Sequence, residues 1–139
     1  MTRDSAALRS HCPINFVAET FGDRWTLLII RDLMFWDKRS YGAFLESDEG
    51  ISTNILADRL KRLEDHGLIS KSVDPENRTR HIYALTQKGL DFLPVMVEIA
   101  AWSGTHDALS SVPKDFMDAY RANRDGLTAF LQARAVKES

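Results

Sequence analysis

The chain has 139 residues, of which 44% are hydrophobic and 27% are charged, and its formal net charge is −2. This length suffices for one domain with a core and an extension, and the composition is that of an ordinary globular protein rather than a disordered or fibrous chain. No apolar run approaches the roughly 20 residues of a membrane span, and the N-terminus lacks the apolar core of a secretory signal, so we expect a cytoplasmic protein that does not contact membranes.

The net charge does not by itself indicate nucleic-acid binding, but the basic residues are unevenly distributed. They gather at Lys38–Arg39, around Arg59 and Arg62, and at Arg78–Arg80, whereas acids dominate the C-terminal third. A weakly acidic protein can still bind DNA through one basic face, because counterion release depends on the phosphates neutralised locally. The charge pattern therefore leaves a nucleic-acid partner open.

The first half of the chain predicts an N-terminal arm and three helices. The arm covers residues 1–13, and a short helix follows over Ile14–Phe21. The apolar spacing in Trp25–Phe35 predicts a buried helix. Ser40 is placed to cap a short helix over Tyr41–Glu46, because its hydroxyl can accept a bond from a free backbone N–H.

An amphipathic helix is predicted over Ser52–His66. Ser52 or Thr53 would cap its start, and Gly67 suits the position just after its end. Its apolar stripe consists of Ile55, Leu56, Leu60 and Leu63. Such a stripe requires burial of one face only, so the polar and basic face would remain in solvent.

A β-hairpin is predicted next. Leu68–Val73 and His81–Leu85 alternate like strands, and Asp74–Arg78 supplies turn residues between them. We expect the tip of the hairpin to carry Arg78, Thr79, Arg80 and His81. The order helix, strand, basic turn, strand is that of a winged helix, in which one helix enters a DNA major groove while the hairpin reaches the flanking backbone.

The fold expected is therefore mainly α with a small antiparallel β-hairpin, an α+β winged helix-turn-helix with additional dimerisation helices. Residues 14–88 would form the DNA-binding part, and residues 89–139 would add dimerisation or effector helices continuous with it. Thr86 would cap a long helix over Gln87–Ser103, kinked by Pro94 and ended by Gly104–Thr105. A last helix is expected over Pro113–Arg134.

The helix after the hairpin has a wide apolar surface that needs a partner. That partner could be the first helix of the same chain or the same helix of a twofold mate. In the second case the protein would be a homodimer. The residues expected at that contact are Leu90, Leu93, Val97, Ala101 and Trp102.

Candidate DNA contacts fall into two groups. The start of the 52–66 helix would reach base edges through Ser52, Thr53 and Asn54, since asparagine can pair with adenine. The second group would reach phosphates through Lys38, Arg39, Tyr41, Arg59 and Arg62, and the minor groove, where narrow A·T tracts concentrate negative potential, through Arg78 and Arg80. Asp58 would repel phosphate unless it holds Arg59 or Arg62 in place. The plainer interpretation is a solvated helix face and a hairpin kept soluble by charge.

Cys12 is the only cysteine, which excludes an intrachain disulfide and a thiolate-rich metal site. It lies at an expected helix start, where backbone N–H groups can stabilise a thiolate, or it is an inert buried thiol. Trp25, Trp36 and Trp102 either belong to the core or line an effector pocket. The histidines lack metal-binding spacing, and no nucleophile–base pair or phosphate loop is evident, so we expect no metal, no cofactor and no enzyme.

Several blocks of the sequence, taken in order, resemble the HxlR family of bacterial transcription regulators. These blocks are Cys12–Pro13, Gly22–Leu33, Leu56–Glu64, Gly67–Ile69 and Tyr83–Gly89. The resemblance implies a homodimeric winged helix-turn-helix protein, built like the MarR group, that binds double-stranded DNA at short inverted repeats near promoters. In parts of this family a cysteine near the position of Cys12 senses electrophiles or oxidants.

We therefore expect a sequence-specific DNA-binding regulator, more often a repressor than an activator, controlled by a small molecule or by thiol modification. The alternative is a protein–protein interaction module that keeps the winged-helix shape without binding DNA. The acidic residues Asp58 and Asp65 and the net charge of −2 favour this alternative slightly.

Overall fold

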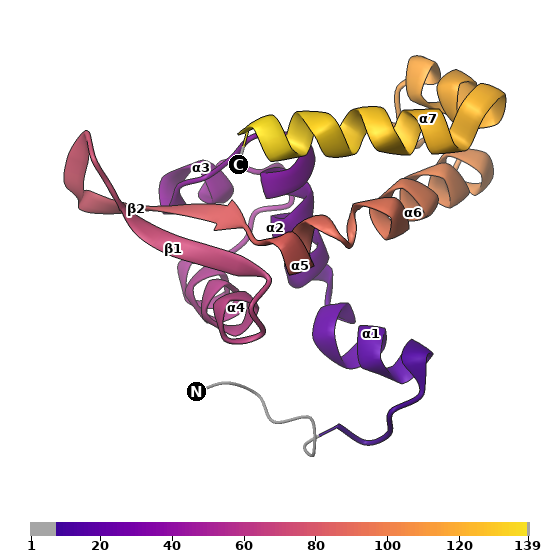
Figure 1. Cartoon of the computed structure of the whole chain (residues 1–139). Coiled ribbons are helices and arrows are strands. Elements are labelled where there is room, and N and C mark those ends of the chain that lie inside the picture. Colours follow the sequence, from indigo (N-terminus) through magenta and orange to yellow (C-terminus); the bar gives the residue numbers. More distant parts are fainter. Residues whose placement is uncertain (1–7, 139) are drawn as a thin grey trace. The chain divides into compact units, whose positions relative to one another are not determined.

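The computed structural model describes residues 8–138, and residues 1–7 of the expected N-terminal arm lie outside that range (Figure 1). The elements are α1 (Pro13–Phe21), α2 (Arg24–Phe35), α3 (Tyr41–Leu45), α4 (Thr53–Asp65), β1 (Ile69–Asp74), β2 (Asn77–Leu85), α5 (Gln87–Leu90), α6 (Leu93–His106) and α7 (Lys114–Glu138). This mainly helical fold with one antiparallel hairpin confirms the predicted fold class.

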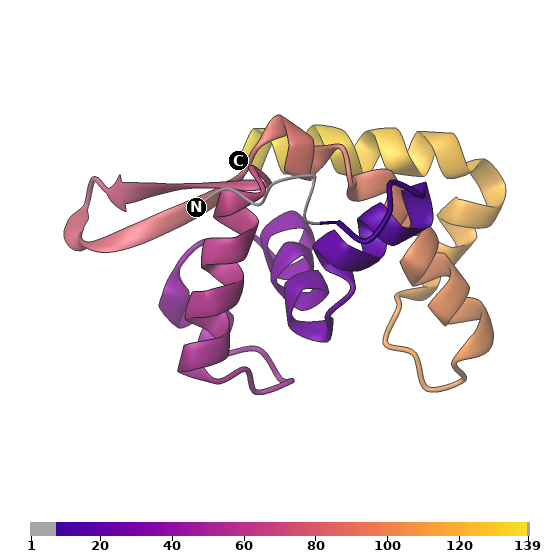
Figure 2. The same ribbon diagram turned by 90° about the horizontal axis from the view of Figure 1, so that it is seen from below.

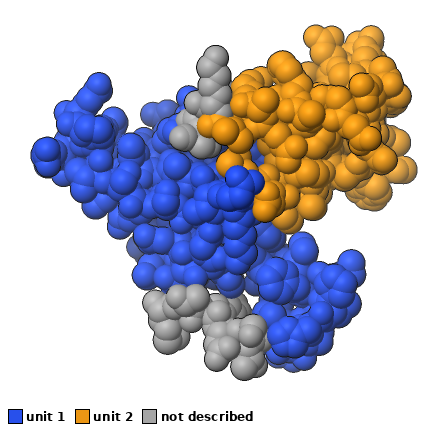
Figure 3. Space-filling model, viewed as in Figure 1, with its two compact units in different colours: residues 1–89 blue, residues 90–139 orange. Residues whose placement is uncertain are grey.

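The chain forms two compact units, residues 1–89 and residues 90–139, which Figure 3 colours separately. Unit 1 holds the helix-turn-helix, α3 followed by α4, and the hairpin. Unit 2 holds α6 and α7. No helix within residues 8–138 is both long and apolar enough to span a bilayer.

The core of unit 1 is built around α2, which packs against α1, α4 and β2. Asp23 caps α2, because its carboxylate accepts bonds from the backbone N–H groups of Trp25 at 2.7 Å and Thr26 at 3.1 Å. From α4 the buried residues are Leu56, Leu60 and Leu63, while Ile55 is half-buried. The predicted apolar stripe thus holds α4 in the core and leaves its opposite face in solvent.

Both ends of α4 are closed by local hydrogen bonds. Ser52 is the cap, since its hydroxyl accepts from the backbone N–H of Ile55 at 3.3 Å. At the other end Gly67 adopts φ +75°, and the N–H of Leu68 reaches the carbonyl of Leu63 at 3.0 Å. This is a Schellman ending that favours glycine, as the sequence predicted.

The hairpin has a regular register from Ile69 opposite Leu85 to Val73 opposite His81, and a bulge beyond it, where Asp74 pairs with Asn77. The tip is therefore shorter than predicted. His81 belongs to β2, and the wing residues 78–80 form the bulge beside the tip. Figures 1 and 2 show the hairpin projecting away from the helices of unit 1.

Local side-chain bonds explain the short tip. The Asp74 carboxylate accepts from the backbone N–H of Glu76 at 2.9 Å and from the Arg80 guanidinium at 2.6 Å. Asn77 accepts from the backbone N–H of Thr79 at 3.2 Å. Aspartate and asparagine commonly close turns this way, which allows β2 to begin at Asn77.

The single long helix predicted after Thr86 is wrong. The chain forms a short α5, breaks at Asp91–Phe92, and restarts as α6 with Pro94 in the first turn. Proline lacks a backbone N–H and is tolerated where a helix begins, since the first N–H groups have no intrahelical acceptor. Pro94 therefore marks a helix start rather than a kink.

The predicted break at Gly104–Thr105 is also wrong, because α6 continues to His106. A Cβ atom on Gly104 would lie 2.7 Å from Met117 Sδ and 2.7 Å from Val112 Cγ1. Glycine is thus present for close packing within unit 2 and does not end the helix. Its only cost is the modest loss of helix propensity.

The last helix, α7, is longer than predicted and is bent at Asn123, where φ is −160° and ψ is 84°. The Asn123 side chain accepts from the backbone N–H of Gly126 at 3.0 Å and so caps the second half of the helix. Glu98 of α6 contacts both sides of the bend: it accepts from the Tyr120 hydroxyl at 2.7 Å and pairs with Arg124 at 3.5 Å.

Candidate nucleic-acid interface

One face of α4 is exposed to solvent. The residues at positions 53, 57 and 61, and those at 54 and 58, follow the spacing that aligns side chains along a helix. The exposed residues are Thr53, Asn54, Ala57, Asp58 and Lys61. Sequence reasoning placed Thr53 and Asn54 at base edges and Lys61 on the polar face without a DNA contact. It overlooked Ala57, which helical spacing from Thr53 would have found. We call these five residues the α4 face.

Tyr41 and Ser52 are engaged in holding the start of α4. The Tyr41 hydroxyl donates to the backbone carbonyl of Thr53 at 2.9 Å, which ties α3 to α4. The Ser52 hydroxyl is the helix cap described above. Both predicted contact residues therefore already have a structural bond, although each hydroxyl retains capacity for a further partner.

Arg59 does not extend into solvent. Its Nε and Nη2 atoms each lie 2.7 Å from Asp23 Oδ2, and its Nη1 lies 2.5 Å from Asp58 Oδ2. Burial raises the pKa of Asp23, but the bonds from the Thr26 N–H and from Arg59 outweigh it and lower that pKa below its ordinary value. Arg59 thus forms an internal cross-link between α2 and α4 and is also held by Asp58, while its contact with phosphate stays a prediction.

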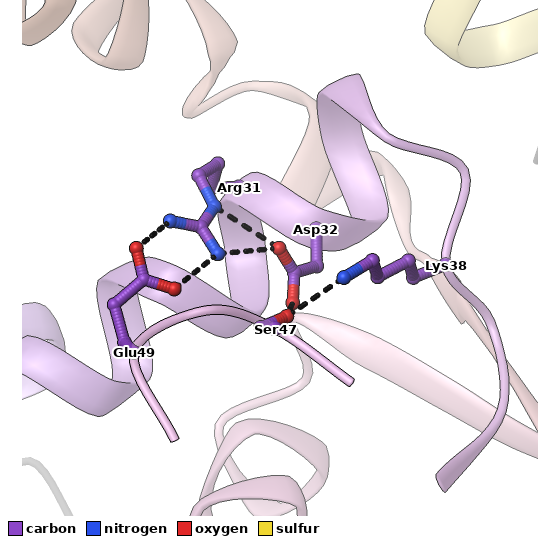
Figure 4. Close-up of polar contacts among 5 residues, drawn as sticks. All are labelled: Arg31, Asp32, Lys38, Ser47 and Glu49. Atoms are coloured by element: carbon purple, nitrogen blue, oxygen red, sulfur yellow. Dashed lines mark hydrogen bonds and ion pairs between the residues drawn. The ribbon is translucent and has the colours of Figure 1, made fainter. Parts of the chain in front are cut away.

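A second polar network fixes the turn between α3 and α4 (Figure 4). Asp32, only 2% exposed, accepts from Arg31 Nη2 at 2.8 Å and from the Ser47 hydroxyl at 2.7 Å. Ser47 in turn accepts from Lys38 Nζ at 2.8 Å. The Arg31 guanidinium also bonds to Glu49 at 2.7 Å and lowers the pKa of that carboxyl. The turn that precedes α4 is therefore anchored to α2.

Lys38 of the first basic cluster belongs to this network, and Arg39 has a separate acidic partner. The Arg31 guanidinium lies 4.0 Å from the centre of the Trp36 ring, and Arg39 Nε bonds to Asp37 at 2.6 Å. Lys38 and Arg39 were predicted to contact phosphate, and both are held by neighbours. Sequence reasoning overlooked this network, although the charged Arg31–Asp32 pair inside an apolar helix was a signal for it.

An effector pocket lined by aromatic residues at a dimer interface stays a prediction. A cavity of about 10 Å³ beside the network is lined by Trp25 but not by Trp36. That volume holds about one water molecule, far below the several hundred Å³ of a small-molecule site.

The hairpin presents both paired and unpaired cations. Arg80 bonds to Asp74, whereas Arg78 is exposed and has no ion-pair partner among the residues that the structure describes. The same holds, within that range, for exposed Lys71 on β1 and for half-buried Arg62 on α4. Lys71 was not singled out from the sequence, because it stands alone between serines.

Cys12 is exposed at the start of α1, so its interpretation as an inert buried thiol is wrong. The backbone N–H groups of Asn15 and Ile14, in the first turn of α1, lower the pKa of the thiol. This is the stabilisation expected at a helix N-terminus, where N–H groups lack intrahelical acceptors.

Four of the five residues expected at a dimer contact are buried within the chain itself: Leu90, Leu93, Val97 and Ala101. The fifth, Trp102, is 68% exposed, and its ring lies 4.8 Å from that of His106. Val95 and Ile99 are also exposed and lie two turns and one turn, respectively, before Trp102 on α6. We call these three residues the α6 stripe.

The sequence profile of HxlR-like helix-turn-helix proteins matches residues 20–110. The chain belongs to this family. The match includes the helix-turn-helix, the hairpin and α6, and it ends before α7. HxlR-like proteins and the relatives named below are transcriptional regulators and not enzymes.

Two curated HxlR-like relatives illustrate the similarity. The HTH-type transcriptional regulator sll1512 of Synechocystis sp. is 38% identical over 86 residues, which cover 62% of this chain and 63% of that protein. YodB of Bacillus subtilis, also an HTH-type transcriptional regulator, is 40% identical over 82 residues, covering 59% of this chain and 72% of YodB. The match therefore spans less than two thirds of sll1512.

Solved structures agree with this assignment. The crystal structure of PA1607 aligns with a TM-score of 0.67 and 31% identity, covering 78% of this chain and 75% of that one. The reduced form of B. subtilis YodB aligns with a TM-score of 0.57 and 34% identity, covering 73% of this chain and 100% of YodB. A structure of diamide-treated YodB aligns with a TM-score of 0.53 and 35% identity, over 70% of this chain and 97% of YodB.

Proposed function

We propose that this HxlR-family protein is a sequence-specific DNA-binding regulator that acts in the cytoplasm as a homodimeric repressor. The observation that carries the proposal is the α4 face, an exposed polar surface on the second helix of a helix-turn-helix. Such a helix fits the major groove, with its first residues at base edges. Thr53 and Asn54 lie in that first turn and can bond to bases.

Phosphate contacts would come from cations without internal partners. Arg62 on α4, together with Arg78 and Lys71 on the hairpin, meets that condition within the described residues. A projecting hairpin can follow the DNA backbone beside the groove that α4 occupies. Lys38, Arg39, Arg59 and Arg80 would contribute less, because each already bonds to a neighbouring side chain.

Dimerisation would involve the α6 stripe. Val95, Ile99 and Trp102 form one exposed apolar row, and apolar rows on helices commonly pack against the same row of a twofold mate. Residues 14–88 would then be the DNA-binding part and residues 89–139 the dimerisation part. Two α4 helices about 34 Å apart would bind an inverted repeat, and occupancy of that operator would block a promoter.

Control of binding by a thiol signal is part of the proposal. Cys12 is exposed and its pKa is lowered, which favours the reactive thiolate. The relative YodB has been solved both reduced and treated with diamide. Because this chain has one cysteine, oxidation would give a disulfide between subunits or a mixed disulfide with a small thiol.

The test is binding to the DNA upstream of the protein's own gene, over a salt series, with and without diamide. We expect tight binding that weakens steeply with salt, because phosphate contacts release counterions. Diamide should abolish binding by the wild type but not by Cys12→Ser. DNA binding that is unchanged by diamide would contradict the proposed thiol control and leave the proposed DNA-binding function standing.

A protein–protein interaction module is the second candidate. The observation that favours it is the internal pairing of Arg31, Arg39, Arg59 and Arg80 with acidic side chains, which reduces the basic surface. The double variant Arg62→Ala/Arg78→Ala distinguishes the two candidates. If the protein is a regulator, the wild type should bind DNA in a salt-dependent way and this variant should not. If it is an interaction module, neither protein should bind DNA.

A further inference from the structure

We propose that Asp58 reads a base directly and selects a cytosine in each operator half-site, and that Arg59 and Asp23 fix its carboxylate in position. The inference rests on the proposed DNA-binding function and specifies the sequence that the α4 face would prefer. An acidic residue, 57% exposed at its side chain, lies in the middle of a surface that should face a polyanion.

A chain of three side chains holds this carboxylate. Asp23 Oδ1 accepts the backbone N–H groups at the start of α2, so the orientation of Asp23 is set by its own helix. Asp23 Oδ2 then binds Nε and Nη2 of Arg59, whose side chain is only 20% exposed. These two bonds fix the orientation of the guanidinium, and its Nη1 lies 2.5 Å from Asp58 Oδ2.

One oxygen of Asp58 remains available. Among residues 8–138 no donor bonds to Asp58 Oδ1, and its neighbours on the α4 face are Asn54 and Lys61. A functional group held by bonds from a rigid support loses little freedom on binding, which is the condition for precise recognition. The adjacent Arg59 charge also reduces the repulsion between this carboxylate and DNA phosphates.

The chemistry of the major groove then selects the base. An ionised carboxylate only accepts hydrogen bonds, and the donors in the groove are cytosine N4 and adenine N6. Adenine also presents the acceptor N7 beside its amino group, whereas cytosine presents no acceptor there. Guanine O6 and thymine O4 would oppose the carboxylate with a second acceptor. Cytosine is therefore the base that Asp58 favours.

The first experiment selects tight-binding duplexes from a randomised pool with the full-length wild type, Asp58→Ala and Asp65→Ala. Asp65 is a matched control, an acid two turns later on α4 that pairs with Lys61 at 3.1 Å. We expect one C·G pair per half-site whose replacement weakens wild-type binding roughly tenfold. Asp58→Ala should lose that preference alone, and Asp65→Ala should keep it.

The second experiment leaves the protein unchanged and therefore holds even if Asp58→Ala folds poorly. N4-methylcytosine at the selected position keeps its pair with guanine but replaces the groove-facing N–H by a methyl group. Wild-type affinity should fall roughly tenfold, as for the loss of one base contact. Asp58→Ala, where it folds, should show no further loss on the methylated duplex.

The outcomes separate the two levels of the proposal. A wild type that selects a specific sequence without a C·G requirement, or an unchanged preference in Asp58→Ala, overturns the role of Asp58 and leaves the regulator function standing. A wild type that selects no sequence at all overturns both. Unaltered binding to the methylated duplex overturns the cytosine contact specifically.

Discussion

Helices α4 and α6 are of similar length but present opposite surfaces. In α4 the leucines at 56, 60 and 63 are buried and the exposed residues are mainly polar or charged. In α6 the residues Leu93, Met96, Val97 and Ala101 are buried, and the exposed side also carries large apolar side chains. One helix is amphipathic, whereas the other is apolar on most of its circumference.

This difference indicates two kinds of partner. An amphipathic helix is satisfied by burial of one face, so the other face is free for a polar ligand such as DNA. A helix that is apolar all round is normally buried, and exposed apolar area on it marks an interaction surface. The comparison predicts that changes around α4 affect stability and base recognition, whereas changes in the α6 stripe affect association.

The largest effect is expected where the polar network supports the turn before α4. Asp32→Ala removes the buried carboxylate that binds Arg31 and Ser47, and it leaves their donors partly unsatisfied. We expect a loss of about 3 kcal/mol in the free energy of unfolding, measured by urea denaturation. Asp48→Ala, an exposed acid in the same turn, should change it by less than about 0.5 kcal/mol. Equal losses in both variants would contradict a special role for the network.

The next effect tests α6 itself. Trp102→Ala should weaken self-association by about 2 kcal/mol, roughly thirtyfold, because large exposed aromatics dominate interface energies. Sedimentation equilibrium measures this change directly. Leu109→Ala removes a more exposed apolar side chain that lies outside α6 and should leave association unchanged. If both variants associate like the wild type, the α6 stripe is not the dimer contact. The exposed apolar surface of α6 would then not indicate an association surface.

How far the sequence determines the fold can be judged from the same two helices. The stripe of α4, a cap at Ser52 or Thr53 and the Gly67 ending were predicted, because each depends on residues within a few positions of one another, and the structure has the cap at Ser52. The course of α6 was not predicted. Proline is compatible with either a helix start or a kink, and glycine with either a helix end or close packing inside a helix. Only tertiary packing against Val112 and Met117 decides that Gly104 lies inside the helix.

In the candidate site, too, local features were predictable from the sequence and contacts between distant residues were not. The exposed start of α4 follows from local pattern, and so does the exposure of Arg78, which has no ion-pair partner within residues 8–138. The internal engagement of Arg59 and Lys38 depends on Asp23 and Ser47, residues remote in sequence, and a charge run does not reveal such partners. Sequence reasoning therefore found the surface but could not tell its committed cations from its available ones.

A smaller effect is expected at the cross-link between α2 and α4. Asp23→Asn can still cap α2 but loses the ionic bond to Arg59, so we expect a loss of about 1 kcal/mol, against about 2 for Asp23→Ala. The folded pKa of Asp23 lies below its ordinary value of 3.8. Its stabilisation is therefore complete above that pH and is lost as the pH falls through the folded pKa.

That pH dependence provides the check on the cross-link. Thermal unfolding of the wild type and of Asp23→Asn should differ near pH 7, and the two should converge as the pH falls below 3.8. A difference that persists unchanged into strong acid would mean that the carboxylate charge does not stabilise the contact between α2 and α4.

The smallest effect is expected in the hairpin, which follows α4 in the sequence and should also contact DNA. It is seen by comparing two arginines. Arg78 has no ion-pair partner among the described residues, whereas Arg80 bonds to Asp74. Arg78→Ala should lower the slope of log affinity against log salt by about 0.9, which is one phosphate contact. Arg80→Ala should lower it by less, since Asp74 already neutralises part of its charge. Fluorescence anisotropy over about 50 to 200 mM salt resolves the difference. Equal slopes would show that DNA displaces Asp74 from Arg80, and that internal pairing in the free protein does not predict which cations meet phosphate.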